Sequence, residues 1–157
     1  MQKRILGGDP SDTRVSPVKW LDLEGIADVE VSSEHPDYPI EAALLPGYSH
    51  GWRASTSGKQ VIRLLFKQAQ QIHCVQLDFL ESACQRSQEY VLRVSQDNGE
   101  TFQDIARQQW NFSPEGSTSE TELHCVDKSH VTHIELIITP DMQQHQAIAS
   151  LERFQIA

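Results

Sequence analysis

The sequence is poor in cysteine, in positive charge and in long apolar runs. Three cysteines among 157 residues cannot form a fully paired disulfide framework, so the fold must rely on a hydrophobic core, which a single domain of this length can form. No apolar run approaches the ~18 residues that a membrane-spanning helix requires. No apolar stretch follows the basic pair near the N-terminus, so no export signal is visible and we expect a cytoplasmic protein.

The scarcity of positive charge limits the choice of partner. The chain has 13 lysines and arginines against 22 aspartates and glutamates, which gives a formal net charge of −9. The acidic excess is concentrated after residue 80. Such a surface repels phosphate backbones and anionic lipid headgroups, so we expect neither nucleic acid nor a membrane as a partner.

Apolar and polar residues alternate along most of the chain, which is typical of β-strands with one buried face. No segment has the i, i+3, i+4, i+7 stripe of an amphipathic helix. Turn residues separate the alternating runs, as in an antiparallel sandwich or jelly roll. Eight strands are predicted, centred on residues 29–31, 61–66, 75–79, 90–94, 102–105, 123–125, 134–138 and 148–156, the last with a bulge near residues 152–153.

The connections between these strands alternate between long and short. Short turns join the second strand to the third, the fourth to the fifth through Asp97-Asn98-Gly99, and the sixth to the seventh. Because successive antiparallel strands reverse direction, the long connections should gather at one end of the sandwich. Loops on a rigid scaffold commonly carry binding residues, so this rim is the candidate site. The long connections are residues 32–58, 81–87, 111–118 and 140–146.

The chain divides into a short N-terminal arm, residues 1–25, and one jelly-roll domain, residues 26–157. Glycine and proline make the arm irregular, and Trp20 is its expected anchor on the sandwich. Residues 21–26 are predicted to form either a short turn or an extra strand. The predicted fold class is all-β: an eight-stranded antiparallel jelly-roll sandwich with an N-terminal arm.

Aromatic and hydrogen-bonding side chains near the long connections are the candidate ligand-binding residues. Trp52 is interpreted either as a core residue or as a flat platform for a sugar ring. Arg86 either pairs with a nearby carboxylate or binds an anionic group of a ligand through its planar guanidinium. Trp110 and Phe112 either fold onto the core or form an exposed patch that binds a protein partner. The full candidate set is Tyr48, His50, Trp52, Arg53, Arg86, Trp110 and Asn111.

Signatures of a metal site, a cofactor or an enzyme are missing. The seven histidines show no zinc-ligand spacing, and Cys74 and Cys125 are predicted to be small buried residues in apolar runs. His124 is expected to point away from a core face held by Leu123 and Cys125. No GxSxG, HExxH, P-loop or dinucleotide-binding motif is present. We therefore expect no catalytic residues, no metal, no cofactor and a non-enzymatic protein, with a hydrolytic jelly roll as the weaker alternative.

Four segments carry a family resemblance through their order and spacing. Residues 39–44 followed by Gly51-Trp52-Arg53 form a loop that ends in Gly-Trp, and residues 90–99 followed by Phe102 form a strand, a turn and an aromatic residue. Residues 27–34 and 149–151 are the corresponding first and closing strands. Together these segments resemble the coagulation factor V/VIII type C (discoidin) domains, with one inserted residue in the turn, over roughly residues 26–157.

The resemblance implies a galactose-binding-domain-like jelly roll and a non-enzymatic recognition module. Many relatives bind glycans, some bind lipid headgroups and some act in intracellular protein assemblies. Calcium-binding relatives often have Asp-Gly in the first long loop and a closing-strand Glu, where this chain has Leu45-Pro46-Gly47 and Arg153. A cation at that place would repel Ca²⁺, so we expect no structural calcium. The expected ligand is a carbohydrate-like small molecule, and the alternative is a protein partner at the same rim.

Overall fold

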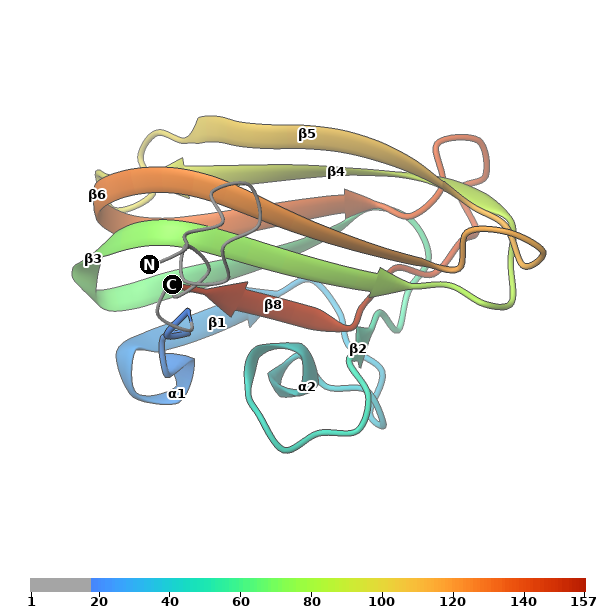
Figure 1. The fold of residues 1–157 in the computed structure, drawn as a ribbon, viewed down its shortest axis with the longest axis horizontal. Coiled ribbons are helices and arrows are strands. Elements are labelled where there is room, and N and C mark those ends of the chain that lie inside the picture. The colour runs from blue at the N-terminus through green and yellow to red at the C-terminus, as the bar shows by residue number, and fades with distance from the viewer. Residues whose placement is uncertain (1–17) are drawn as a thin grey trace, which may run out of the picture.

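Two long strands, β3 (Gln60–Leu80) and β6 (Ser119–Thr139), form the centre of the fold (Figure 1). They pair antiparallel from Gln60 opposite Ile138 to Leu80 opposite Ser119, and the ribbon that they form bends in its middle. Each of the two strands therefore contributes to both layers of the molecule. The structure, a computed structural model, describes residues 18–157, so the expectations for residues 1–17 of the arm lie outside the described residues.

Both layers of the sandwich are antiparallel. The larger layer has five strands in the order β1, first half of β3, second half of β6, β4 and β5. The smaller layer consists of β8, the second half of β3 and the first half of β6. The predicted all-β antiparallel jelly-roll sandwich is thereby confirmed. The other elements are β1 Ala27–Val31, β4 Arg86–Ser95, β5 Gln103–Phe112 and β8 Arg153–Ile156, the two-residue strands β2 Trp52–Arg53 and β7 Ser150–Leu151, and the short helices α1 Leu23–Ile26 and α2 Glu41–Leu44.

Two of the predicted turns are bends inside the long strands. The short turn expected between the second and third predicted strands falls where the pairing of β3 with β6 shifts in register, between Leu65 and Cys74. In the facing bend of β6, Asp127 and His130 have φ angles of 44° and 53°, and such left-handed residues bend a strand at a bulge. The second and third predicted strands are therefore one strand that crosses from the larger layer to the smaller one.

Alternation along the strands places the hydrophobic core between the layers. Leu64 of the larger layer and Leu77 of the smaller layer are 1% and 0% exposed. Burial of one such side chain contributes about 1.5–3 kcal/mol. The alternation breaks at Glu152, between β7 and β8, so that Leu151 and Phe154 are both buried. In place of one strand with the predicted bulge, the chain therefore forms two short strands, β7 and β8, with a bend at Glu152 between them.

All four long connections begin and end at one end of the sandwich, the right-hand end in Figure 1, and the first of them extends below β8 toward the middle, where it forms α2. They are hydrogen-bonded to one another there: Glu81 N donates to Thr118 O (2.7 Å), and Gly58 N donates to Ala147 O (3.0 Å). The bends of β3 and β6 and the hairpin between β4 and β5 lie at the opposite end. In that hairpin Asn98-Gly99 has φ angles of 61° and 85°, as expected for an Asn-Gly turn.

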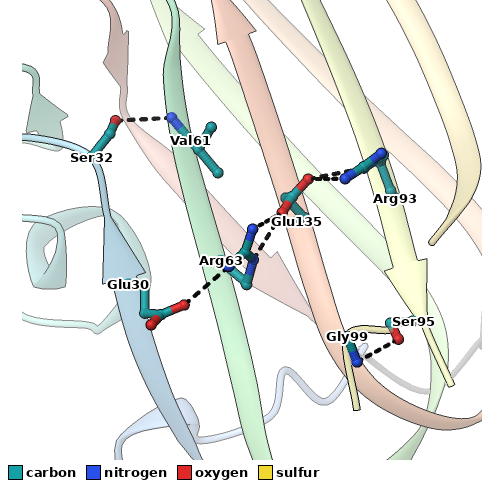
Figure 2. Close-up of polar contacts among 8 residues, drawn as sticks. All are labelled: Glu30, Ser32, Val61, Arg63, Arg93, Ser95, Gly99 and Glu135. Carbon is teal, nitrogen blue, oxygen red and sulfur yellow. Dashed lines mark hydrogen bonds and ion pairs between the residues drawn. The ribbon is translucent and has the colours of Figure 1, made fainter. Parts of the chain in front are cut away.

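A ladder of alternating charges crosses the outer face of the larger layer (Figure 2). Glu30 on β1 pairs with Arg63 on β3, and Glu135 on β6 lies between Arg63 and Arg93. Glu135 is only 2% exposed and accepts two bonds from each arginine, with the Nε atoms at 2.8 Å for Arg63 and 2.9 Å for Arg93. The Phe102 ring lies 5.8 Å from the Arg63 guanidinium and 4.5 Å from that of Arg93. The aromatic residue after the hairpin thus helps to cover the buried carboxylate.

The described end of the arm packs against the sandwich. Leu21 N donates to Ile156 O in β8 at 2.7 Å, and Leu23 is part of the core at 4% exposure. Of the two predictions for residues 21–26, the short turn is present, as helix α1, and Asp22 caps it by accepting a bond from Glu24 N. No helix within residues 18–157 is long and apolar enough to cross a bilayer.

Candidate functional site

A cavity of about 400 Å³ opens among the long connections, and we call it the rim cavity. Arg53 of the first connection, residues 80–86 after β3 and residues 141–150 before and in β7 contribute to its walls. Leu80 and Ile148 are apolar patches in a lining that is otherwise rich in amide, hydroxyl and charged groups. The volume lies within the range of small-molecule sites, about 300–1,000 Å³. The polar lining includes Gln85, Asp141, Gln144, Gln146, Ser150 and Glu152.

Arg86 anchors the wall of the rim cavity. It begins β4, is 3% exposed, and its Nε donates to Glu81 Oε1 at 2.8 Å. Its Nη1 donates to Pro140 O and to Gln88 Oε1, both at 2.9 Å, and the Phe112 ring lies 4.9 Å from the guanidinium. Of the two interpretations of Arg86, the carboxylate pair is confirmed, and its side chain joins two of the long connections. Its Nη2 is buried with no partner in the described part of the chain.

The first long connection brings an aromatic ring and three basic side chains together beside the rim cavity. The Tyr38 ring lies 4.6 Å from the His50 ring and 4.9 Å from the Arg53 guanidinium, and His35 meets its edge at 5.4 Å. Backbone bonds hold this arrangement, because Arg53 N donates to Tyr38 O and His35 N donates to Arg53 O. No pattern in the sequence singles out Tyr38, which lies in an irregular segment without periodicity.

Trp52 belongs to the core and offers no ring face to a ligand. Its side chain is 1% exposed, and its Nε1 donates to Ser33 O at 3.0 Å. In the pairing of β2 with β7, Trp52 lies opposite Leu151. Gly51 approaches the closing segment so closely that an added Cβ would lie 2.2 Å from Leu151 O. The Gly-Trp pair therefore fixes the end of the first long connection to the core, and the stacking-platform interpretation is wrong.

Tyr48 and His50 line a different and larger hollow of about 560 Å³, which we call the arm groove. Trp20 of the arm and residues 42–50 form part of its walls, and Tyr48 is 45% exposed. Glu152 lines both the arm groove and the rim cavity, so the two hollows are neighbours. Tyr48 and His50 thus line the arm groove while Arg53 and Arg86 line the rim cavity, although His50 and Arg53 contact the same Tyr38 ring.

Trp110 and Asn111 lie in β5 rather than in a loop, and they line neither hollow. Trp110 is half-buried, whereas Asn111 is exposed and its Oδ1 accepts a bond from Ser87 Oγ at 2.7 Å. Phe112 is completely buried. Of the two interpretations of Trp110 and Phe112, packing onto the core is confirmed and the exposed patch is wrong, because the pairing of β5 with β4 continues to Phe112 and strand alternation turns the rings toward the core.

Arg153, the closing-strand cation identified in the sequence, lies exposed on β8. Its Nε is 4.0 Å from Asp78 Oδ2 on the neighbouring β3. No group of three or more histidine, cysteine or acidic side chains within residues 18–157 is arranged to hold a metal ion.

Polar side chains enter the space between the layers along the first half of β6. His124 lies opposite the buried Val75, and its Nε2 is 2.8 Å from the Tyr90 hydroxyl. The predicted orientation of this strand is wrong, because Leu123 and Cys125 are exposed and His124 points inward. Residues directly opposite each other in a sheet share a face, so the register with β3 decides the orientation.

Glu120 is the most buried carboxylate in the first half of β6, and we expect it to make the stability of the folded domain depend on pH. It is 5% exposed, and burial raises its pKa from 4.5 to about 8, with a further rise from the Glu122 carboxylate. A group whose pKa is higher in the folded state contributes stability below its unfolded pKa, and this contribution disappears as the pH rises. The folded protein should therefore lose stability between pH 4.5 and about 8.

Glu120→Gln should remove this loss. We expect its thermal midpoint to exceed that of the wild type by about 5 °C at pH 8.5 and to match it at about pH 5. Circular-dichroism melts at both pH values, with the exposed Glu100→Gln as the matched control, measure the effect. An equal shift at both pH values would contradict the assignment to Glu120.

The fold is similar to that of family 32 carbohydrate-binding modules. One module from Clostridium perfringens, in complex with GalNAc-β-1,3-galactose, has 21% sequence identity and a TM-score of 0.61, covering 88% of this chain and 99% of that chain. The NanJ module of C. perfringens, in complex with galactose, has 14% identity and a TM-score of 0.60, covering 87% and 96%. The AlyQ module, in complex with 4,5-unsaturated mannuronic acid, has 14% identity and a TM-score of 0.63, covering 89% and 98%. At these identities the likeness concerns the fold.

No curated protein matches the sequence of this chain. The profile of the F5/8 type C domain matches residues 28–153. That range includes both long strands, β4 and β5, and it ends at the first residue of β8. The chain therefore belongs to the F5/8 type C (discoidin) domain family.

Proposed function

We propose that this domain is a non-catalytic recognition module that binds a carbohydrate-like ligand in the rim cavity. The lining of that cavity carries the proposal, because amide and hydroxyl side chains from separate connections converge there beside the exposed guanidinium of Arg53. Sugar hydroxyls donate and accept hydrogen bonds, and the amides of Gln144 and Gln146 also do both. The complexes of three structurally similar modules with saccharides support this class of ligand.

The side chains around the rim cavity have different expected roles. Arg53 is oriented by its contact with the Tyr38 ring and can donate to a hydroxyl or a carboxylate. Leu80 and Ile148 provide the apolar surface against which the C–H face of a sugar ring can pack. Arg86 holds the walls in place, so that little conformational entropy is lost when a ligand binds.

Calorimetric titration with galactose and N-acetylgalactosamine tests the proposal. We expect the wild type to bind at least one of these probes, and Arg53→Ala and Gln144→Ala each to weaken binding about tenfold or more, which corresponds to about 1.4 kcal/mol. Both side chains are exposed, so thermal melts should show that the variants fold. Arg107→Ala is the matched control, because Arg107 is an exposed arginine on β5 that pairs with Glu89 and lines neither hollow.

Two results would reject this assignment. Loss of binding in Tyr48→Ala with unchanged binding in Arg53→Ala would assign the ligand to the arm groove. A wild type that gives no heat with any saccharide of a broad panel would reject the ligand class.

A second candidate function is recognition of a protein partner by the same rim. It is favoured by Leu80, Met142 and Ile148, whose exposures of 44%, 45% and 38% are high for apolar side chains. Of the two anchors expected from the sequence, Phe112 is buried, and Trp110 is half-buried and does not line the rim cavity. Binding of a saccharide by the wild type, weakened by Arg53→Ala, would favour the first function over this one.

A further inference from the structure

Two cysteines face each other on the outer surface of the smaller layer. Cys74 on β3 and Cys125 on β6 are direct cross-strand partners. Their neighbours Val75 and His124 point inward, so the two thiols point outward. Both cysteines are free, Cys125 is exposed and Cys74 is half-buried. The pair is therefore accessible to a small thiol-reactive molecule.

The backbone bonds of Cys74 identify the type of this cross-strand pair. Cys74 N donates to Ala157 O, and Ala157 N donates to Cys74 O, both at 2.9 Å. The peptide groups of Cys74 thus point toward the C-terminal residue and away from β6. Cys74 and Cys125 are consequently a non-hydrogen-bonded pair, in which the Cα atoms lie about 4.5 Å apart.

This separation fits a covalent bond between the two sulfur atoms. Disulfides join cysteines whose Cα atoms are roughly 4.4–6.8 Å apart, so little backbone movement is needed. The third cysteine, Cys84, lines the rim cavity at the opposite end of the sandwich and is not placed to compete.

We propose that Cys74 and Cys125 are a reversible modification site that forms an intramolecular disulfide by exchange with glutathione disulfide. The Cys125 thiolate attacks one sulfur of glutathione disulfide and releases one glutathione thiolate. The Cys74 thiolate then attacks the Cys125 sulfur of the mixed disulfide and releases the second glutathione. Each cysteine gives its proton to a departing glutathione, so the protein loses two protons and two electrons while glutathione disulfide is reduced to two glutathiones.

The different surroundings of the two thiols support this order of attack. Burial and the adjacent Cys125 thiol raise the pKa of Cys74. A thiol with a raised pKa has less thiolate and attacks more slowly, so the exposed Cys125 reacts first. Cys74 then acts as the resolving cysteine, because it lies directly opposite Cys125 and its side chain is on the same face of the layer.

The bond would constrain the unfolded chain and leave the rim cavity unchanged. The segment between the two cysteines contains β4 and β5, and a disulfide that closes so long a segment removes much unfolded-state entropy. The pair lies next to the bends of β3 and β6, at the end of the sandwich away from the rim. The inference is therefore independent of the proposed ligand.

Equilibration of the full chain in glutathione redox buffers tests the proposal. In an oxidising buffer we expect the mass of the chain to fall by about 2 Da, two thiols to become unreactive, and peptide mapping to join Cys74 to Cys125. The thermal midpoint should rise by about 5 °C or more, and dithiothreitol should reverse every change.

Serine variants distinguish formation of the Cys74–Cys125 disulfide from other oxidation of the cysteines. Cys84→Ser should still form the bond, whereas Cys74→Ser should stop at a glutathione adduct on Cys125. Thermal melts of the reduced variants check that they fold. Persistence of both thiols in the oxidising buffer, a bond that involves Cys84, or a disulfide between two chains instead of within one would overturn the proposal.

Discussion

Replacing Glu135 by alanine is expected to lower the free energy of unfolding by about 3 kcal/mol. The substitution removes the carboxylate that Arg63 and Arg93 share and leaves two guanidinium groups side by side. Loss of one partner of a buried ion pair costs about 3–5 kcal/mol, because the remaining charge is desolvated and unpaired. The arginine side chains are 38% and 31% exposed and can recover some hydration, so the lower end of that range applies.

Urea unfolding measures this loss without the ionic screening that guanidinium chloride would add. Glu30→Ala is the matched control, because Glu30 belongs to the same ladder but its side chain is 62% exposed and makes a single bond of 3.3 Å to Arg63. Such an exposed pair contributes about 0.5 kcal/mol. Equal losses in the two variants would mean that burial of Glu135 has no energetic importance.

Trp52→Ala should destabilise the domain by about 3–5 kcal/mol. The indole is 1% exposed, its removal leaves a cavity beside Leu151, and Ser33 O loses the hydrogen bond from Nε1. Since domains are stable by only about 5–15 kcal/mol in total, a large part of the stability would be lost. The thermal midpoint and the urea midpoint both report this effect.

Trp52→Phe distinguishes a core role from a binding role at this position. Phenylalanine keeps much of the apolar volume but cannot donate to Ser33 O, so we expect a smaller loss of stability and a folded domain. Saccharide binding should then match that of the wild type, because the Trp52 ring faces the core. A variant that folds with wild-type stability but no longer binds would contradict the core assignment.

The fold class was predictable because the alternation of apolar and polar residues along a strand follows directly from the burial of one of its faces. Arg63 lies between the buried Ile62 and Leu64, and Glu135 lies between the buried Ile134 and Leu136, since one face of each strand meets the core and the other carries the charge ladder. The Asn98-Gly99 turn was predictable because few other residue pairs adopt positive φ at both positions without strain. Counting strand reversals then sufficed to place the long connections together at one rim.

The candidate site was less predictable, because loop residues have no period. Trp52 and Tyr48 are both aromatic residues in the same connection, and only the contact with Leu151 makes one of them a core residue. The alternation of apolar and polar residues also led to a wrong prediction in the first half of β6, at the edge of the smaller layer. Leu123 and Cys125 are more apolar than His124, yet the register with β3 turns the histidine inward.

The continuity of β3 and β6 through both layers has a mechanical consequence. In a sandwich whose layers are joined by loops alone, one layer can slide or hinge over the other. Here the same two hydrogen-bonded strands run through both layers, so relative motion of the layers would have to distort the ladder at the bends. The connections at the rim are thus carried by one rigid frame, and their residues can vary without loosening it.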